Sequence, residues 1–308
     1  MNIFLSGGSG FVGSHFCNDD NIKRIVVRDK KHCKHWECEK YNIDAIDGKT
    51  DWSNAFEDID VVIHLAALAH LQTFTKSDYE EVNVDGTLNL AKQAAFAGVK
   101  RFVFVSSIGV HGAATVDGPI TANSPLCPSN DYTRSKLHAE FALKELSLRT
   151  GLEVVIVRPT LVYGVNAPGN FGLLTKLISL IPVLPFYTLN NKRDFISVEN
   201  LKDLLKCCAL HPCAKNNTFL ASEGDTVSIK EFTNAIAKGL GKKVYQLPIP
   251  LRLMRITGKL LGKSAMIEQL VGNFQVDSSD LRKVLGWTPP YTMEESMALL
   301  KEQNKESR

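Results

Sequence analysis

The stretch "NDYTRSK" places a tyrosine, Tyr132, four residues ahead of a lysine, Lys136. An Asn or Asp before an amphipathic run is typical of a helix start, and we expect a helix from about Tyr132 through Leu148. Residues four apart share a helix face, so the ammonium group would lie beside the phenol. Because a nearby positive charge favours the phenolate, we expect the pKa of Tyr132 to fall below its reference of about 10. Such a tyrosine could exchange a proton with a hydroxyl or a carbonyl.

A serine upstream could act on the same oxygen. Ser107 ends the apolar run "RFVFVSS" (residues 101–107), which we expect to be a central strand. In open α/β sheets, ligands bind beyond the carboxyl ends of the strands, where a serine hydroxyl can hydrogen-bond a reacting oxygen. Taken singly, the serine could close a turn and the Tyr/Lys pair could be a helix opening with a surface lysine. Together, Ser107, Tyr132 and Lys136 predict a catalytic site.

The N-terminal stretch "SGGSGFVG" spaces Gly7, Gly10 and Gly13 three residues apart, directly after the apolar run of residues 2–7. Glycines there permit a tight turn, a close approach of the backbone to a pyrophosphate, and close packing of a helix on a strand. The N–H groups at the helix N-terminus would hold the anion. A plain structural turn is the alternative, but the position after the first strand favours a dinucleotide-binding loop.

The end of the second expected strand, residues 24–27, bears on the choice of nicotinamide cofactor. An acidic residue there accepts a hydrogen bond from the ribose 2'-hydroxyl of NADH, whereas an arginine accommodates the 2'-phosphate of NADPH. Both types follow the strand, as Arg28 and Asp29. Because the register could shift by one residue, the sequence leaves NAD and NADP open, and Arg28 could also be a solvated charge.

Short apolar runs alternate with amphipathic segments through the first two thirds of the chain. This alternation is typical of a parallel sheet wrapped by helices, and near-continuous apolar runs indicate strands covered on both faces. We therefore expect an α/β fold, with a Rossmann-type doubly wound parallel sheet and a smaller C-terminal α/β substrate lobe. The expected strands are residues 2–7, 24–27, 60–67, 101–107, 153–159 and 219–222. The expected helices are residues 12–17, 84–97, 132–148, 198–210, 228–240 and 294–301.

After about residue 165 the apolar and helical segments become shorter and are separated by prolines. We expect a dinucleotide-binding domain at residues 1–165, with strands that return to it from the later chain. A nucleotide-sugar lobe at residues 166–300 and a polar tail at residues 301–308 would follow.

Composition bears on the class of function. The 308 residues are 44% hydrophobic and 22% charged, which is typical of a folded globular protein. A net charge of +3 without a basic block does not favour nucleic acid or membrane partners. The apolar window at residues 171–187 is interrupted by one lysine and two prolines, so we expect a buried helix and loop without membrane insertion. Because no secretory signal pattern opens the sequence, a cytoplasmic location is expected.

Cysteine usage predicts reduced thiols, since the seven cysteines show no paired spacing. The stretch "HCKHWEC" (residues 32–38) holds four thiol or imidazole side chains and is the one candidate metal site. It lacks the C-x2-C spacing of zinc sites and no second pair follows, so we expect no metal.

Six motifs occur in the order found in the extended short-chain dehydrogenase/reductase family, which the sequence therefore resembles across nearly its whole length. Within it, the chain is most similar to the UDP-sugar 4-epimerase and 4-ketoreductase branch of the NAD-dependent epimerases and dehydratases. The motifs are the glycine loop, "HLAA" (64–67), "NVDGT" (83–87), "VSSIGVHG" (105–112), "YTRSK" (132–136) and "RPTLVYG" (158–164). Two further stretches, "KRDFISVENL" (192–201) and "LGWTPP" (285–290), are similar to the substrate lobe of that branch.

The resemblance implies a nicotinamide dinucleotide, NAD or NADP, as the cofactor. Lys136 would hold the nicotinamide ribose, Asp47 would contact the region near adenine, and Asn83 would line the cofactor unless it is an ordinary helix cap. The residues implied to contact the dinucleotide are Gly7, Gly10, Phe11, Val12, Gly13, Arg28, Asp29, Asp47, Leu65, Ala66, Ala67, Asn83, Tyr132, Lys136 and Pro159. Three histidines, His64, His70 and His138, are expected to pack or to lie at the surface without a catalytic role.

A UDP-sugar is the substrate that the resemblance implies. Arg193 and Asn170 would bind its diphosphate, which needs basic or amide donors, and Ser107 and Thr160 would lie near the sugar. Arg193 could instead form a surface ion pair with a neighbouring acid, Asp194 or Glu199.

Three positions depart from the family pattern. The family pattern has a second arginine that is missing here, and the residue nearest to its position is Gln269. His111 stands where the family commonly has a tyrosine, and Thr160 stands where galactose epimerases have asparagine. With these departures, the sequence resembles a subgroup of reductases.

Three outcomes of hydride transfer at C4 are known in the family. Dehydratases carry an acidic pair directly after the catalytic serine or threonine, but here Ile108 and Gly109 follow Ser107, which disfavours dehydration. We favour a reductase of a UDP-4-keto-6-deoxy-N-acetylhexosamine, of the UDP-N-acetylquinovosamine or fucosamine type, in surface-polysaccharide synthesis. A UDP-glucose or UDP-N-acetylglucosamine 4-epimerase is the alternative, because it would use the same catalytic residues.

A non-catalytic nucleotide-sensing Rossmann protein is the alternative of another class. The resemblance also implies a homodimer.

Overall fold

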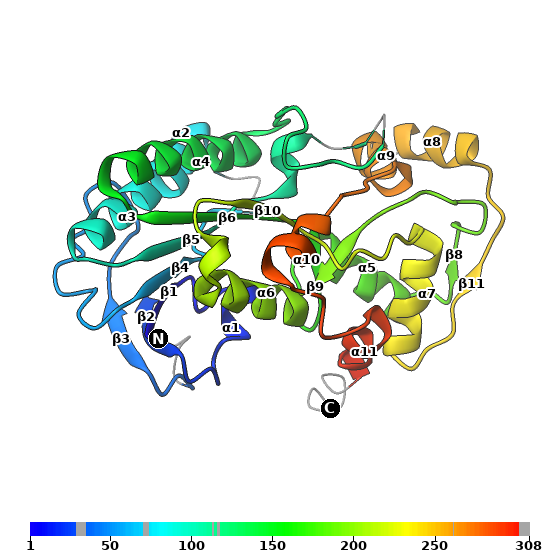
Figure 1. The fold of residues 1–308 in the computed structure, drawn as a ribbon. Helices are drawn as coiled ribbons and strands as arrows, with labels where there is room; N and C mark the ends of the chain where they lie inside the picture. The colour runs from blue at the N-terminus through cyan, green and yellow to red at the C-terminus, as the bar shows by residue number, and fades with distance from the viewer. Residues whose placement is uncertain (29–34, 70–73, 113, 116–117, 261, 302–308) are drawn as a thin grey trace.

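Seven parallel strands form the central sheet of the computed structural model, which describes residues 1–28, 35–69, 74–112, 114–115, 118–260 and 262–301. The strands are β1 Ile3–Ser6, β2 Ile22–Val27, β3 Glu39–Asn42, β4 Val61–His64, β5 Arg101–Val105, β6 Glu153–Pro159 and β10 Thr218–Ala221. Their order is β10-β6-β5-β4-β1-β2-β3, so the sheet grows outward from β1 in both directions (Figure 1). The predicted doubly wound parallel sheet is therefore confirmed.

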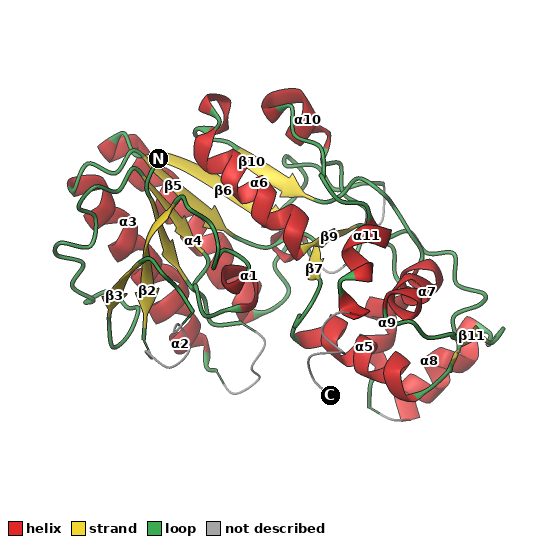
Figure 2. Cartoon of the chain, turned by 90° about the horizontal axis from the view of Figure 1, so that it is seen from below, coloured by secondary structure: helices red, strands yellow, loops and turns green. Residues whose placement is uncertain are grey.

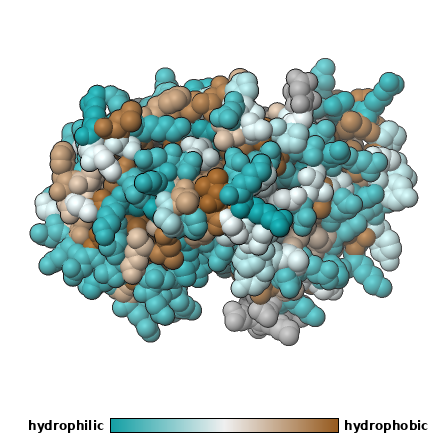
Figure 3. Space-filling view, viewed as in Figure 1, coloured by the Kyte–Doolittle hydropathy of each residue, from teal (hydrophilic) through white to brown (hydrophobic). Residues whose placement is uncertain are grey.

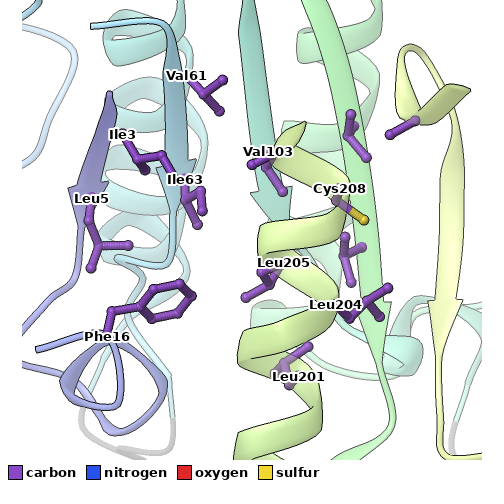
Figure 4. Packing of buried hydrophobic residues seen from close by; sticks show 14 of the residues in the cluster. Ile3, Leu5, Phe16, Val61, Ile63, Val103, Leu201, Leu204, Leu205 and Cys208 are labelled. Atoms are coloured by element: carbon purple, nitrogen blue, oxygen red, sulfur yellow. The ribbon is translucent and has the colours of Figure 1, made fainter. Parts of the chain in front are cut away.

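Helices cover both faces of this sheet. Because successive strand residues point to opposite faces, Phe4 packs towards α3 (Thr87–Phe96) and α4 (Asp131–Thr150), whereas Leu5 packs towards α6 (Val198–Leu210). Figure 4 shows the second of these cores, in which the leucines of α6 and aliphatic side chains from β1, β4 and β5 belong to one cluster. Burial on both faces explains why these strands are continuous apolar runs in the sequence.

Strand β3 is a part of the sheet that the sequence analysis does not predict. Three of its four residues, Glu39, Lys40 and Asn42, are polar and exposed, and among the described strands it pairs only with β2, at the edge of the sheet. Edge strands commonly carry charged side chains, which prevent pairing with other chains. A polar edge strand has no apolar signature from which the sequence could reveal it.

A second lobe lies beside the carboxyl ends of the strands (Figures 1 and 2). Its core includes two phenylalanines, Phe195 and Phe232, whose rings stack with centroids 3.8 Å apart. Its helices are α5 Gly169–Leu180, α7 Ile229–Gly239, α8 Leu251–Leu260, α9 Ser264–Val271 and α11 Met293–Ala298. Its short strands are β7 Leu161–Tyr163, β8 Val183–Leu184, β9 Phe195–Ser197 and β11 Tyr245–Gln246.

The chain crosses between the lobes more than once. Strand β10, helix α6 and helix α10 (Ser279–Leu285) all come from the later chain and contribute to the core on the sheet. The boundary near residue 165 stays a prediction, and most of the predicted polar tail lies outside the described residues. The remaining short helices are α1 Phe11–Ser14, α2 Lys76–Tyr79, η2 Glu80–Gly86, η3 Ile108–His111 and η4 Pro212–Ala214.

The apolar window at residues 171–187 forms most of α5 and the β8 segment, but the expectation that it is buried is wrong in part. Phe171 and Ile178 are buried, whereas the leucines at positions 173, 177 and 180 are exposed. An amphipathic helix on a lobe surface needs only one buried face. Among the described residues, no helix has both the length and the apolar character to span a bilayer.

The described cysteines at positions 17, 127, 207, 208 and 213 are free thiols. The first three residues of the "HCKHWEC" stretch, residues 32–34 with Cys33, lie outside the described residues. Among the side chains that the structure describes, no group of three or more His, Cys, Asp or Glu residues could hold a metal ion.

Candidate active site

The glycine loop joins β1 to α1 and can be built only with glycine at two positions. Gly7 has a φ of 79°, and a Cβ there would lie 2.7 Å from the Ala66 nitrogen. A Cβ on Gly13 would lie 2.1 Å from the Gly7 oxygen, so this residue lets α1 pack against the loop. At Gly10 a Cβ would meet only the Gly7 oxygen, at 3.2 Å, which leaves its other side open to an approaching group. These are the features of a dinucleotide-binding turn.

Helix α1 is even shorter than expected, with four residues. Gly10 occupies its N-cap position and supplies no side-chain acceptor, so the backbone N–H groups of Phe11 and Val12 in the first turn have no capping partner. Uncapped N–H groups after a glycine turn suit a pyrophosphate. The residues present therefore fit the phosphates of a dinucleotide.

The residues after β2 leave the cofactor's 2'-phosphate preference open. Arg28 is exposed directly after the last strand residue, and Asp29 lies outside the described residues. If Arg28 binds a 2'-phosphate, Arg28→Ala should raise the KM for NADPH by about tenfold or more while the KM for NADH changes little. Steady-state kinetics with both cofactors would measure this, and equal changes in the two KM values would contradict the assignment.

Asp47, which was predicted to lie near adenine, forms a tight turn after β3. Its carboxylate accepts hydrogen bonds from the Lys49 N–H at 2.8 Å and from the Thr50 hydroxyl at 3.0 Å. Gly86 lies against this turn, since a Cβ there would be 3.0 Å from the Asp47 nitrogen. The contact brings the end of η2 to the predicted adenine side of the site.

Asn83 is buried inside η2, a π-helical segment, and is not a helix cap. Its Oδ1 accepts from the Leu68 N–H at 2.8 Å, and its Nδ2 donates to the Leu68 carbonyl and to the Ser135 hydroxyl, at 3.1 and 3.0 Å. The amide therefore ties the loop after β4, which contains Leu65, Ala66 and Ala67, to helix α4. Asn83 positions the loop that was predicted to line the cofactor, and π-helical segments are frequent at such sites.

Helix α4 begins as the sequence predicts. Asn130 caps it, and the Asn130 side chain accepts from the Thr133 N–H in a capping box. Ser107 caps the 3-10 turn η3 and accepts from the Gly109 N–H at 3.1 Å. A Cβ on Gly109 would lie 2.8 Å from Thr133 Cγ2, so glycine lets the Ser107 turn pack on the first turn of α4, beside Tyr132.

Lys136 is buried beneath the same region. Its Nζ donates to the Val105 carbonyl at 2.8 Å and lies 4.6 Å from the centroid of the Phe104 ring. Tyr132, one turn earlier on α4, is half-buried, and its ring lies 6.3 Å from that of Tyr79. The end of strand β5 and the first turns of helix α4 thus place Ser107, Tyr132 and Lys136 in one region.

The pKa of Tyr132 moves in the direction opposite to our expectation. Burial, followed by the neighbouring Tyr79, raises the pKa of Tyr132 to about 12. Burial also lowers the pKa of Lys136 to about 7, against an opposing effect of Glu140. Desolvation disfavours both the Lys136 ammonium and the Tyr132 phenolate. Lys136 is therefore only partly protonated at neutral pH, and its charge does not offset the effect of burial on the pKa of Tyr132. With this pKa, Tyr132 is a protonated phenol at neutral pH.

Two of the three histidines named above have hydrogen-bond partners in the structure, one at a buried position and one at the surface. His64 bridges the Ser6 hydroxyl (Nδ1, 2.6 Å) and the Thr87 hydroxyl (Nε2, 2.8 Å) beneath the Phe104 ring. Burial and the nearby Lys136 lower the pKa of His64 to about 3, so it is neutral. His138 is exposed and contacts Glu80, and His70 lies outside the described residues.

A buried polar network that the sequence analysis did not predict lies beside the candidate catalytic residues. Arg158 on β6 makes two hydrogen bonds to Glu140 on α4, of 2.9 and 2.5 Å, and contacts His111 Nε2 at 2.8 Å. Because arginine can only donate, His111 accepts through Nε2 and donates from Nδ1 to the Pro125 carbonyl, at 3.1 Å. The network joins the end of the Ser107 turn to α4, one turn beyond Lys136.

The predicted diphosphate residues lie together in the second lobe. Arg193 donates from Nη1 to the carbonyls of Gln269 and Gly272, at 2.6 and 3.0 Å, and Asn170 Nδ2 lies 3.4 Å from Gln269 Oε1. Among the described residues, Arg193 forms no ion pair with Asp194 or Glu199. The other N–H groups of the Arg193 guanidinium have no hydrogen-bond partner among these residues. Burial lowers the pKa of Arg193. A cation anchored by carbonyls, with donors left over, suits an anionic ligand.

Thr160 is less available to a substrate than predicted. It is buried after β6, and its hydroxyl donates to the Ala221 carbonyl at 3.1 Å. Pro159, the last residue of β6, is also buried. The pairing of β6 with β10 ends at Pro159 and Ala221. The Thr160 hydroxyl therefore extends the contact between these strands by one residue.

Known proteins resemble the chain in both sequence and structure. A model of the NAD dependent epimerase/dehydratase family matches residues 3–220. The chain is 40% identical over 302 residues to a UDP-glucose 4-epimerase of Vibrio cholerae, across 95% of this chain and 92% of that protein. It is 27% identical over 314 residues to the N-acetyl-alpha-D-glucosaminyl-diphospho-ditrans,octacis-undecaprenol 4-epimerase of Escherichia coli, across 96% and 93%.

A solved structure shares the fold. The UDP-N-acetylglucosamine 4-epimerase from Methanobrevibacter ruminantium, in complex with UDP-N-acetylmuramic acid, superposes with a TM-score of 0.80 at 22% identity. The match covers 100% of this chain and 99% of that one. At this identity the likeness concerns the fold.

Proposed function

The chain belongs to the NAD-dependent epimerase/dehydratase family, and from this we propose that it is an enzyme that interconverts the C4 epimers of a UDP-linked sugar. The observation that carries the proposal is the assembly of the Ser107 turn, Tyr132 and Lys136 at the end of β5, in a fold with an intact glycine loop. The UDP-glucose 4-epimerase among the relatives supports the reaction type. The assembled site also argues against a non-catalytic nucleotide sensor.

The chain's own residues have distinct roles in this proposal. Bound NAD supplies the chemistry of accepting a hydride from C4 and returning it. Tyr132 takes the proton from the C4 hydroxyl and gives it back through its phenolic oxygen, while the Ser107 hydroxyl hydrogen-bonds the same sugar oxygen. Lys136 holds the nicotinamide ribose, and the fraction of it that is protonated favours the phenolate form of Tyr132. Arg193 binds the diphosphate.

Reduction of a 4-keto sugar, which we favoured from the sequence, is the second candidate. One observation favours it: with a pKa of about 12, Tyr132 is the protonated donor that a ketone needs, whereas epimerisation must first deprotonate a hydroxyl. Dehydration has no support, because η3 places Ile108 and Gly109, not acids, after Ser107.

One experiment separates these functions. The purified protein is incubated with UDP-glucose, UDP-N-acetylglucosamine and UDP-4-keto-6-deoxy-N-acetylhexosamine, with and without NADH or NADPH, and sugar products and nicotinamide absorbance are followed. C4 inversion without added reduced cofactor is expected. Stoichiometric cofactor oxidation with the keto sugar alone would establish the reductase instead, and no turnover with bound nucleotide would favour the sensor. The homodimer and the cytoplasmic location stay predictions.

Arg193→Ala should raise the KM for the UDP-sugar by about 10- to 100-fold, because a half-buried charge-assisted contact to the diphosphate is lost. The kcat should change less, since the contact is made in both the ground state and the transition state. Lys192→Ala, at the exposed neighbouring position, is the matched control and should leave both constants near wild type. An unchanged KM in Arg193→Ala would remove this arginine from the substrate site.

A further inference from the structure

Helix α8 carries three of its apolar side chains outward. Leu253, Ile256 and Leu260 are 48%, 56% and 80% exposed, and the spacing i, i+3, i+7 places them on one helix face. The buried residues of the helix are Met254 and Gly258. Figure 3 shows brown side chains among teal ones at the upper right, where Figure 1 places α8. A face of this kind gains free energy only when something removes it from water.

The segment around α8 is strongly basic. Residues 242–268 contain six basic residues and one acidic residue, a net charge of +5, whereas the whole chain carries +3, so the rest of the chain is net −2. The near-neutral total therefore hides a local concentration of positive charge. The basic residues are Lys242, Lys243, Arg252, Arg255, Lys259 and Lys263.

Most of this charge is available to a ligand. Arg255 pairs with Glu268, the single acid of the segment. No carboxylate of the described residues pairs with Arg252, Lys259 or Lys263, all of which are exposed. On α8 the positions 252, 255 and 259 form a stripe beside the exposed apolar stripe, so the outward surface of the helix is half apolar and half basic.

The apolar surface continues onto the small sheet next to α8. Tyr245 of β11 pairs with Val183 of β8, and both side chains are exposed. Leu247, two residues after Tyr245, is 45% exposed and leads into the start of α8. Tyrosines beside aliphatic side chains are common where a protein meets the water–lipid boundary, because their rings are apolar and their hydroxyls are polar.

We propose that α8, together with the β8/β11 sheet, docks on an anionic phospholipid membrane and lies in the plane of its surface. Leucine and isoleucine side chains enter the acyl boundary, and the basic stripe meets the phosphate headgroups. A second copy of the chain is a poor occupant, because the same face would bring +5 against +5. A nucleic acid would use the basic stripe and leave the apolar stripe in water.

Docking would also orient the substrate side of the molecule. Helix α9 packs next to α8 and carries Gln269, whose carbonyl holds Arg193. The predicted diphosphate site would therefore lie near the lipid surface. Docking itself does not depend on the proposed reaction, because it is measured by binding.

The test is flotation of the full-length protein with vesicles of phosphatidylcholine alone and of phosphatidylcholine with phosphatidylglycerol. We expect binding to the anionic vesicles that falls tenfold or more in Arg252→Glu/Ile256→Ser, and that weakens as salt rises in the wild type. Lys144→Glu/Leu148→Ser, an exposed pair with the same spacing on α4, is the matched control and should bind like the wild type. Leu253→Ser/Leu260→Ser, which changes no charge, should also lose binding.

Several results would overturn the proposal. These are no binding of the wild type to anionic vesicles, an equal loss in the α4 control, or full binding by both α8 variants. A wild-type oligomer that the α8 variants convert to monomers would show that a second copy covers this face. Turnover of a soluble UDP-sugar should be unchanged in the α8 variants, so failure of docking and failure of the proposed reaction give different results.

Discussion

Tyr132→Phe is expected to lower kcat by about 10³-fold while NAD binding stays within about twofold of the wild type. General acid–base catalysis contributes about 10²- to 10⁴-fold to such reactions, and phenylalanine removes the proton-carrying oxygen while keeping the ring. The ring is half-buried near Tyr79, so the substitution conserves packing. Turnover measured with the substrate found active, together with a fluorescence titration of the dinucleotide, checks both parts.

Tyr79→Phe is the matched control for this prediction. It removes a hydroxyl from the ring that stands 6.3 Å from Tyr132 and leaves the reacting phenol in place. We expect less than a tenfold change in kcat. Retained turnover in Tyr132→Phe, or equal losses in the two variants, would remove Tyr132 from the proton-transfer step.

Lys136→Met is expected to abolish turnover and to change how the stability of the nucleotide-free protein depends on pH. Burial lowers the pKa of Lys136 to about 7 in the folded state, against 10.5 for the unperturbed group. The unfolded chain therefore binds more protons than the folded chain between these values. The resulting destabilisation is fully present below about pH 7 and fades as the pH rises towards 10.5. Methionine cannot be charged and is free of this effect.

The quantity to measure is the difference in the free energy of unfolding between the wild type and Lys136→Met, from urea denaturation at pH 7 and pH 9.5. Each pKa unit corresponds to about 1.4 kcal/mol, so the wild type should gain about 2–3 kcal/mol relative to the variant over this range. Lys144→Met, at an exposed position on the same helix, should show no such gain. Parallel pH curves for the wild type and Lys136→Met would show that Lys136 stays charged in the folded protein.

Local patterns in the sequence were sufficient for most of the fold around the site. Buried parallel strands must be apolar on both faces, which made β1, β4, β5 and β6 recognisable. Gly7 and Gly13 are required by the backbone itself, and Asn130 marks the start of α4 through its capping box. Helix α6 was predicted with its observed bounds, Val198–Leu210. Each of these features depends on residues that are close in the sequence, or on a regular pattern of apolar residues that face the core.

Surface elements were harder to predict. Strand β3 is polar because it lies at the sheet edge, and α8 shows its apolar side chains to solvent, so neither follows the rule that apolar residues mark the buried face. The basic stripe of α8 was hidden in a near-neutral total charge. Only the folded arrangement shows that these charges lie on one exposed surface.

The sequence by itself determined which residues are candidates for the site, because residue type and spacing specify the glycine turn, the helix that carries Tyr132 and Lys136, and the strand that ends near Ser107. The tertiary structure alone decided their electrostatic state and their partners. It reversed the expected pKa shift of Tyr132, engaged the Thr160 hydroxyl with Ala221, and tied Asn83 to Leu68. The physical reason is that desolvation and long-range hydrogen bonds depend on segments far apart in the chain, which no local pattern records.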